Sequence, residues 1–206
     1  LRAVGRVSRL QERVAGQGAC GPLGIAHTRW ATHGEPAEHN AHPHVSGGLA
    51  VVHNGIIENH EVLREQLQGL GYAFTSDTDT ETVAHLVQAC LDGKMGDGCD
   101  DLFAAVRYAV TRLQGAYALA MIRMGEPDTL VLAREGSPLM VGRGDDGFYA
   151  ASDASALVAV TRKLMYLENG DVARVTSDGV EMTDRHGRTI TRPVVQSGVD
   201  AEAVAL

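Results

Sequence analysis

The ten residues HTRWATHGEP at positions 27–36 combine cationic, aromatic and hydroxyl side chains in a segment that ends in glycine and proline. A guanidinium such as that of Arg29 can hold a carboxylate through two parallel hydrogen bonds, and Thr32 and His33 lie near enough in sequence to add to that grip. The alternative for Arg29 is an ordinary surface ion pair. Trp30 is the single tryptophan of the sequence. Its indole suits either a binding pocket or core packing.

The dipeptide Asn54-Gly55 interrupts an apolar run over residues 48–57. A plain hairpin turn between two strands is one interpretation, because this pair readily adopts positive φ angles. In the other, the Asn54 amide and the Gly55 N–H point at one spot and stabilise a developing oxyanion. Asp79 either favours the positive end of a helix or holds a substrate ammonium group. Together these groups describe a site for an amino acid with a reactive side-chain carbonyl.

Three histidines, His39, His42 and His44, lie within the six residues HNAHPH. Imidazole is a common metal ligand, so a metal site is one reading of this cluster. Pro43 prevents a helical arrangement of the rings, and no carboxylate or thiolate lies at a helpful spacing. We therefore expect neither a metal ion nor another cofactor.

The sequence has three cysteines, Cys20, Cys90 and Cys99. Their number and spacing form neither an even disulfide framework nor a paired zinc motif, which is typical of a reducing compartment. Cys90 and Cys99 are interpreted as a small core thiol and a loop thiol.

The composition is that of an acidic globular chain of 206 residues, with 44% hydrophobic residues and a formal net charge of −8. This length allows one large domain with a sizeable core. Lysines and arginines are scattered, which does not favour binding to nucleic acid. No window approaches the roughly 18 apolar residues of a membrane span, and the first residues do not resemble a signal peptide. We expect a cytoplasmic protein without nucleic-acid or membrane partners.

Helices are predicted in the middle of the chain, where they would position the polar residues. Residues 58–71 have leucines at helical spacing and end at Gly71. Residues 75–91 predict a second helix, in which Thr78 and Glu81 have capping-box spacing and Asp79 lies in the first turn. A third helix is expected over 100–113.

Strands are predicted on both sides of this helical region. The run LGIAH at 23–27 predicts a strand that leads into the first polar segment, and the run at 48–57 predicts two strands. Further β-rich runs cover 116–122, 128–135, 138–144, 147–153, 171–179 and 179–184. Strand-rich ends around a helical middle favour mixed layers of helix and sheet.

Four blocks, HTRWATHGEP, NAHPH, VVHNGIIENH and SDTDTE, occur in an order and spacing that resemble the glutaminase domain of the glutamine–fructose-6-phosphate aminotransferase (glucosamine-6-phosphate synthase) family. GAYALAMI, REGSPLMVG and ASDASAL continue the resemblance over nearly the whole chain. It implies an α+β fold, the four-layer αββα sandwich of the N-terminal nucleophile hydrolases, as in other class II glutamine amidotransferases. Residues 1–192 would form the glutaminase domain. Residues 193–206 would begin a linker toward a sugar-isomerase domain.

The resemblance also assigns roles in binding L-glutamine. Arg29, with Thr32 and His33, would hold the α-carboxylate. Asp79 would hold the α-ammonium group, and Trp30 would gate the entrance to a channel for ammonia.

For the chemical step, the resemblance makes Asn54 and Gly55 the oxyanion hole. The family's nucleophile is an N-terminal cysteine whose own amine is the base. We expect the segment that carries it to precede Leu1, and Cys20 does not lie in a matching context. This chain alone would then be inactive.

The implied activity is hydrolysis of glutamine to glutamate and ammonia, which would aminate fructose 6-phosphate in the sugar-isomerase domain of a homo-oligomeric enzyme of hexosamine biosynthesis. Two alternatives stay open: a catalytically dead module that binds glutamine or mediates assembly, and a class II amidotransferase that serves another acceptor.

Overall fold

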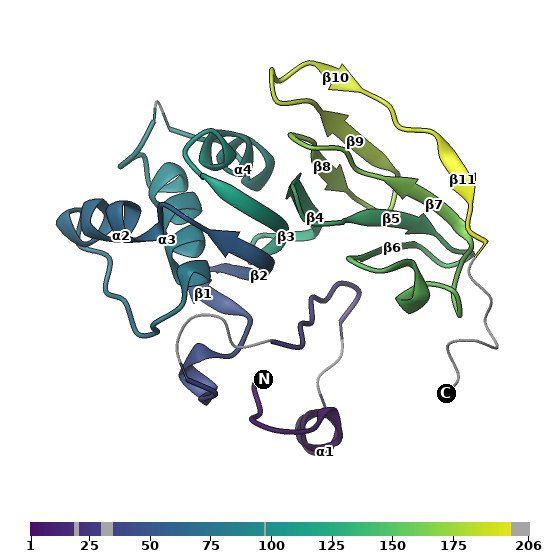
Figure 1. Cartoon of the computed structure of the whole chain (residues 1–206), viewed down its shortest axis with the longest axis horizontal. Coiled ribbons are helices and arrows are strands. Elements are labelled where there is room, and N and C mark those ends of the chain that lie inside the picture. Colours follow the sequence, from purple (N-terminus) through teal and green to yellow (C-terminus); the bar gives the residue numbers. More distant parts are fainter. Residues whose placement is uncertain (19–20, 30–34, 97, 199–206) are drawn as a thin grey trace.

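The computed structural model describes residues 1–18, 21–29, 35–96 and 98–198 (Figure 1). Its helices are α1 (Val7–Gln17), α2 (His60–Gly69), α3 (Asp79–Leu91) and α4 (Leu102–Val110), with two short 3₁₀ turns, η1 (Glu38–Asn40) and η2 (Ala154–Ala156). Its strands are β1 (His44–Ser46), β2 (Leu49–Ile57), β3 (Gly115–Arg123), β4 (Glu126–Glu135), β5 (Met140–Arg143), β6 (Phe148–Ala151), β7 (Lys163–Tyr166), β8 (Val172–Val175), β9 (Val180–Thr183), β10 (Thr189–Ile190) and β11 (Val194–Gln196).

The strands form two antiparallel sheets, one of seven strands in the order β1-β2-β3-β4-β8-β9-β10 and one of four in the order β11-β7-β5-β6. Helices α2, α3 and α4 lie beside the first sheet (Figure 1), and their apolar faces share a core with β2, β3 and β4. A second core joins the other side of this sheet to the smaller sheet. The predicted α+β class is confirmed.

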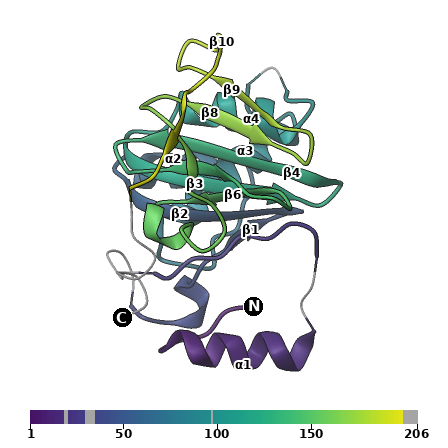
Figure 2. The same ribbon diagram turned by 90° about the vertical axis from the view of Figure 1, so that its right-hand side faces the viewer.

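The outer side of the smaller sheet carries a third, smaller apolar cluster, in which Leu157 and Ala154 of the η2 turn pack with Met140 and Leu164. The αββα sandwich would have a helical layer on this side of the smaller sheet. In the described part of the chain, the η2 turn occupies the place of that layer. Helix α1 lies outside the layers (Figure 2) and has no buried residue.

The three helices of the middle region are confirmed, since α2, α3 and α4 lie within the predicted ranges. The N-cap of helix α4 is Asp101, whose side chain accepts a hydrogen bond from the Ala104 N–H at 2.7 Å. The capping box predicted for α3 was wrong. Thr78 precedes the helix without a side-chain cap, because its hydroxyl bonds to His44 and Ser76 instead. None of the helices in the described ranges is long and apolar enough to span a bilayer.

The predicted hairpin at Asn54-Gly55 was wrong, because β2 runs unbroken through both residues. Asn54 lies opposite Ala118 and Gly55 opposite Tyr117 in the pairing with β3. The hairpin turn lies earlier, between β1 and β2, where Gly47 has a φ of 55°. Nine consecutive pairs with β3 hold the Asn54-Gly55 peptide in an extended strand.

Gly55 is required by its close contact with β3. Its φ is 137°, and a Cβ at this position would lie 2.1 Å from the carbonyl oxygen of Ala116. Only glycine fits such an approach without moving the strand.

The run at 23–27 does not form the predicted strand. Leu23 and Ile25 instead pack with their side chains against the core between the two sheets. The β-rich runs after residue 115 are confirmed as β3, β4, β5, β6, β8 and β9. Helix α1 and the short strands β1, β7, β10 and β11 were not predicted, and β11 lies within the segment assigned to the linker.

Cys90 and Cys99 are joined by a disulfide, with their Cα atoms 5.7 Å apart. Their interpretation as a core thiol and a loop thiol was therefore wrong. An odd number of cysteines still allows one pair, and nine residues of separation are enough for the segment after α3 to return to the buried end of that helix. Cys20 lies outside the described residues.

Candidate active site

The site is a cavity of about 320 Å³ where β2, the start of α3 and the segment before residue 30 meet. The structure brings four predicted residues to its wall, namely Arg29, Asn54, Gly55 and Asp79. The other cavity residues are His27, Thr28, His42, His53, Ile56, Thr78 and Thr80. Trp30, Thr32 and His33 lie outside the described residues, so their roles stay predictions.

Asp79 is the first residue of α3 and is 5% exposed. Its Oδ2 accepts a hydrogen bond from the backbone N–H of Ile57 at 2.8 Å and lies 3.8 Å from Nδ1 of His53. The positive end of the helix favours a carboxylate at this position. Asp79 thus joins the start of α3 to the end of the strand that carries Asn54 and Gly55.

Asn54 has an exposed side chain, whereas its neighbour His53 is buried. Successive side chains of a strand point to opposite faces, so the Asn54 amide is free of the packing that holds His53. Together with Asp79 and Arg29, this amide gives one cavity an anion, a cation and a neutral donor. Such a set suits a zwitterion that also carries a polar carbonyl.

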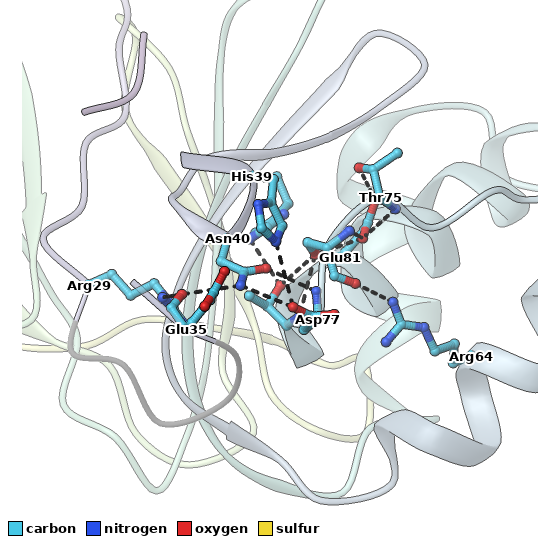
Figure 3. A network of polar contacts seen from close by, with 11 residues as sticks. Arg29, Glu35, His39, Asn40, Arg64, Thr75, Asp77 and Glu81 are labelled. Atoms are coloured by element: carbon cyan, nitrogen blue, oxygen red, sulfur yellow. Dashed lines mark hydrogen bonds and ion pairs between the residues drawn. The ribbon is translucent and has the colours of Figure 1, made fainter. Parts of the chain in front are cut away.

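Arg29 is half-buried and donates from Nη1 to the backbone oxygen of Glu35 at 3.1 Å. Asn40 lies between Glu35 and Asp77 (Figure 3). Its Nδ2 donates to the same oxygen of Glu35 and to Oδ2 of Asp77, both at 3.2 Å, and its Oδ1 accepts from the Asp77 N–H at 2.9 Å. A chain of polar contacts therefore links Arg29 to the residues before α3.

Asn40 is fully buried, and the sequence reasoning missed it. A signal was available, because this asparagine stands in the same NAHPH block as the histidines that were considered for metal binding. Buried amides are kept only where their donors and acceptors are satisfied, and Asn40 uses both ends of its side chain.

Four histidines, His27, His42, His44 and His53, lie together in a row, and His27, His42 and His53 of this row line the cavity. The ring centroids of His27 and His42 are 4.1 Å apart, and those of His42 and His44 are 5.1 Å apart. Burial, reinforced by His27 and His44, lowers the pKa of His42 to about 2. Burial and the charge of Arg2 lower the pKa of His44 to about 4. These rings are neutral at physiological pH.

Burial also lowers the pKa of His53, although Asp79 opposes the shift. It likewise lowers the pKa of His27, with help from Arg29. His39, in contrast, has a half-exposed side chain 3.6 Å from Asp77. The row therefore contains two residues of the HNAHPH block and two that the sequence analysis did not single out. The signal for His53 was a polar residue at an inward position of an apolar strand.

Glu81 anchors the loop before α3. Its carboxylate accepts hydrogen bonds from the backbone N–H groups of Thr75 at 2.9 Å and Ser76 at 2.7 Å. Both hydroxyls of those residues donate to it as well. Burial works to raise the pKa of Glu81, but the imidazole of His85 at 3.7 Å and the hydrogen bonds from Ser76 and Thr75 outweigh it and hold the pKa well below its usual range.

The sequence of this chain matches known protein families. A family model described as a glutamine amidotransferase domain matches residues 27–159. A protein of Pseudomonas putida named glutamine–fructose-6-phosphate aminotransferase [isomerizing] is 53% identical over 203 residues, covering 98% of this chain and 32% of the relative. A relative of the same name from Neisseria meningitidis serogroup B is 49% identical over 208 residues, covering 100% and 33%. The chain thus spans about a third of the length of these curated relatives.

Solved structures share the fold. Glutamine phosphoribosylpyrophosphate amidotransferase from B. subtilis, complexed with ADP and GMP, has a TM-score of 0.65 at 26% identity. The match covers 79% of this chain and 35% of that one. A structure described as the allosteric regulatory enzyme of purine biosynthesis has a TM-score of 0.63 at 27% identity, covering 77% and 34%.

Proposed function

This chain belongs to the glutamine amidotransferase family, and from that premise we propose that its cavity binds L-glutamine and assists release of the side-chain amide nitrogen as ammonia. The fold is that of the class II, N-terminal nucleophile type. One observation carries the proposal: Arg29, Asp79, Asn54 and Gly55 line a single cavity of about 320 Å³, which is in the size range of small-molecule sites.

Each of these residues has a role that fits its position. Arg29 holds the α-carboxylate, with Thr32 and His33 as further contacts. Asp79 holds the α-ammonium group, as its buried carboxylate at the start of α3 allows. The Asn54 amide and the Gly55 N–H stabilise the oxyanion, and Trp30 gates the path of ammonia. Preorganised donors of this kind commonly contribute the largest single term in acyl transfer.

The reaction consumes water and converts glutamine to glutamate and ammonia. A thiolate attacks the amide carbonyl, the tetrahedral intermediate expels ammonia, and water hydrolyses the acyl-enzyme. We assign the thiol to an N-terminal cysteine of the mature protein, on a segment before Leu1. The chain supplies the oxyanion donors and the residues that bind the α-carboxylate and α-ammonium groups of the amino acid.

We assign to the ammonia the acceptor in the relatives' name, fructose 6-phosphate, which yields glucosamine 6-phosphate in hexosamine biosynthesis. The acceptor would bind a sugar-isomerase domain that follows the linker segment 193–206. Residues 1–192 are then the glutaminase domain of a cytoplasmic homo-oligomer. The proportion of the relatives that this chain matches, 32%, supports a role as one domain of a larger enzyme.

Calorimetric titration with L-glutamine tests the binding part of the proposal, because binding does not require the nucleophile. We expect binding, and we expect Asp79→Asn to weaken it by roughly 10- to 100-fold, because a charge-assisted hydrogen bond is lost. Asp92→Asn is the matched control, since Asp92 follows the opposite end of α3. No binding of glutamine, or equal binding by the Asp79 variant, would overturn the assignment.

A further inference from the structure

Thr80 forms a buried bridge between two histidines directly behind Asp79. Its Oγ1 lies 3.0 Å from Nδ1 of His53 and 3.1 Å from Nε2 of His42. The same hydroxyl lies 3.4 Å from Oδ1 of Asp79. Thr80 is 1% exposed and His53 is 3% exposed, so the contact between these two is shielded from solvent, whereas His42 is half-buried. The bridge therefore connects β2 and the segment before β1 to the first turn of α3.

Counting protons limits how this bridge is arranged. The Thr80 hydroxyl has one proton, and the Asp79 carboxylate has none. Three polar atoms surround that hydroxyl, so it must accept from at least one imidazole N–H. Nδ1 of His53 also faces Oδ2 of Asp79 at 3.8 Å, where a bare nitrogen lone pair would be repelled. The proton of His53 is therefore on Nδ1, and that N–H points toward Thr80 and Asp79.

A second hydroxyl and histidine follow the same pattern two residues earlier. The Glu81 carboxylate accepts from the Ser76 hydroxyl at 2.7 Å, so the oxygen of Ser76 accepts from the Thr78 hydroxyl at 3.0 Å. The oxygen of Thr78 lies 3.0 Å from Nε2 of His44, which is the third contact of this chain. Thr78 and Thr80 thus each contact a buried histidine of β1 or β2 through their hydroxyls.

We propose that His53 and Thr80 are positioning residues for Asp79, with His53 held as the Nδ1–H tautomer and Thr80 transmitting its orientation to the carboxylate. The consequence rests on the proposed function: the Asp79 carboxylate is preorganised for the ammonium group of glutamine. These contacts account for His42 and His44 without a ligand, because both histidines bond to threonines at the start of the helix that carries Asp79. The Asp79 carboxylate is held by the Ile57 N–H on one oxygen and faces the Thr80 hydroxyl on the other. It therefore needs no rearrangement when the substrate binds.

The first test is the tautomer of His53 in the unliganded chain, read from long-range ¹⁵N–¹H correlations of its imidazole. We expect a protonated Nδ1 and a bare Nε2 in the wild type. In Thr80→Val, which keeps the shape and removes the hydroxyl, the ¹⁵N shift of Nδ1 should move. An Nε2–H tautomer in the wild type, or shifts of His53 unchanged by Thr80→Val, would refute the bridge.

The second test is the affinity for L-glutamine. Thr80→Val should weaken binding about tenfold or more, as expected when a buried hydrogen bond is lost. Thr80→Ser should restore it to near the wild-type value, because it retains the hydroxyl. Thr82→Val is the matched control: Thr82 lies on the same helix, is fully buried and has no hydrogen bond from Oγ1 within the described residues.

The two readouts separate the positioning role from the proposed function. If the wild type binds no glutamine, the proposed function and the positioning role both fail, while the tautomer still decides whether the bridge exists. If the wild type binds glutamine and Thr80→Val binds equally well, only the positioning role is wrong. Circular dichroism of each variant confirms that the comparison concerns folded protein, and the wild-type tautomer decides the bridge if Thr80→Val does not fold.

Discussion

The Asp79 carboxylate and the Ile57 backbone N–H are joined by a 2.8 Å hydrogen bond. This contact fixes the start of α3 against the end of β2. Because Asn54 and Gly55 lie on the same strand, the proposed oxyanion donors and the proposed ammonium anchor have a fixed separation. The geometry of the site follows from the pairing of one helix with one strand.

Gly55→Ala should destabilise the chain by about 3 kcal/mol or more, because the new Cβ would lie 2.1 Å from the Ala116 oxygen on a backbone with φ of 137°. Urea denaturation measures the loss. Gly69→Ala, at a helical glycine with nothing within 4 Å of the new Cβ, is the control and should not destabilise. Equal stability of the two variants would contradict the account of the β2–β3 contact.

Asn54→Ala should lower kcat for glutamine hydrolysis by roughly 10²–10³ in a longer chain that carries the nucleophile, as expected for an oxyanion donor. The KM should change little, because Asn54 makes its contribution in the transition state. Release of glutamate gives both constants. Asn169→Ala, which removes an amide that bonds to the Gly136 N–H and does not line the cavity, should leave kcat unchanged. A wild-type kcat in the Asn54 variant would leave that residue with a purely structural role.

The buried histidines should make the fold sensitive to mild acid. In the unfolded chain a histidine has a pKa near 6.5, whereas His42 and His44 in the fold have pKa values of about 2 and 4. The unfolded state therefore binds more protons as the pH falls below 6.5, and the free energy of unfolding decreases. The slope approaches about 1.4 kcal/mol per pH unit for each such histidine, down to its folded pKa.

Urea denaturation at several pH values between 7.5 and 4.5 measures this dependence. His42→Gln should reduce the slope of the free energy of unfolding against pH, because the unfolded variant has one histidine fewer to protonate. His39→Gln is the control, since His39 has a half-exposed side chain outside the buried row. A free energy of unfolding that stays constant over this range would be inconsistent with neutral, buried rings.

The Cys90–Cys99 disulfide should contribute to stability under oxidising conditions. It closes a loop across a sequence separation of nine residues, for which the chain-entropy model gives roughly 2–3 kcal/mol. Adding dithiothreitol should therefore lower the Tm of the wild type. Cys99→Ser should have the lower Tm from the outset and show no response to the reductant. If the wild type melts at the same temperature with and without reductant, the bond has no stabilising role.

The sequence predicts best where the pattern is local. The leucines of α2 and the apolar face of α3 determine helices by periodicity alone, and both formed as expected. The strand at Asn54-Gly55 could not be predicted in this way, because the local preference for a turn is outweighed by nine pairs with β3, about 60 residues later in the chain. The strand expected at 23–27 did not form. Its apolar residues are packed against the core between the sheets, but no neighbouring strand pairs with this segment.

The site was predicted in part. Arg29, Asn54, Gly55 and Asp79 were expected together, and the structure brings them to one cavity. Asn40, Thr80 and His53 were missed, because their importance depends on contacts between segments 27 to 38 residues apart. A buried polar residue is visible in a sequence only as an exception to an apolar pattern. Its partner is visible only in three dimensions.

The buried amide of Asn40 has a consequence for which amino acids fit. Its contacts to Glu35 and Asp77 link the segment that carries Arg29 to the residues just before Asp79. The distance between the cationic and anionic groups is then a fixed dimension of the cavity. A β-amino acid, whose ammonium and carboxylate groups are one carbon further apart, has the right charges and the wrong length. On the proposed function, the cavity should therefore bind it more weakly than L-glutamine.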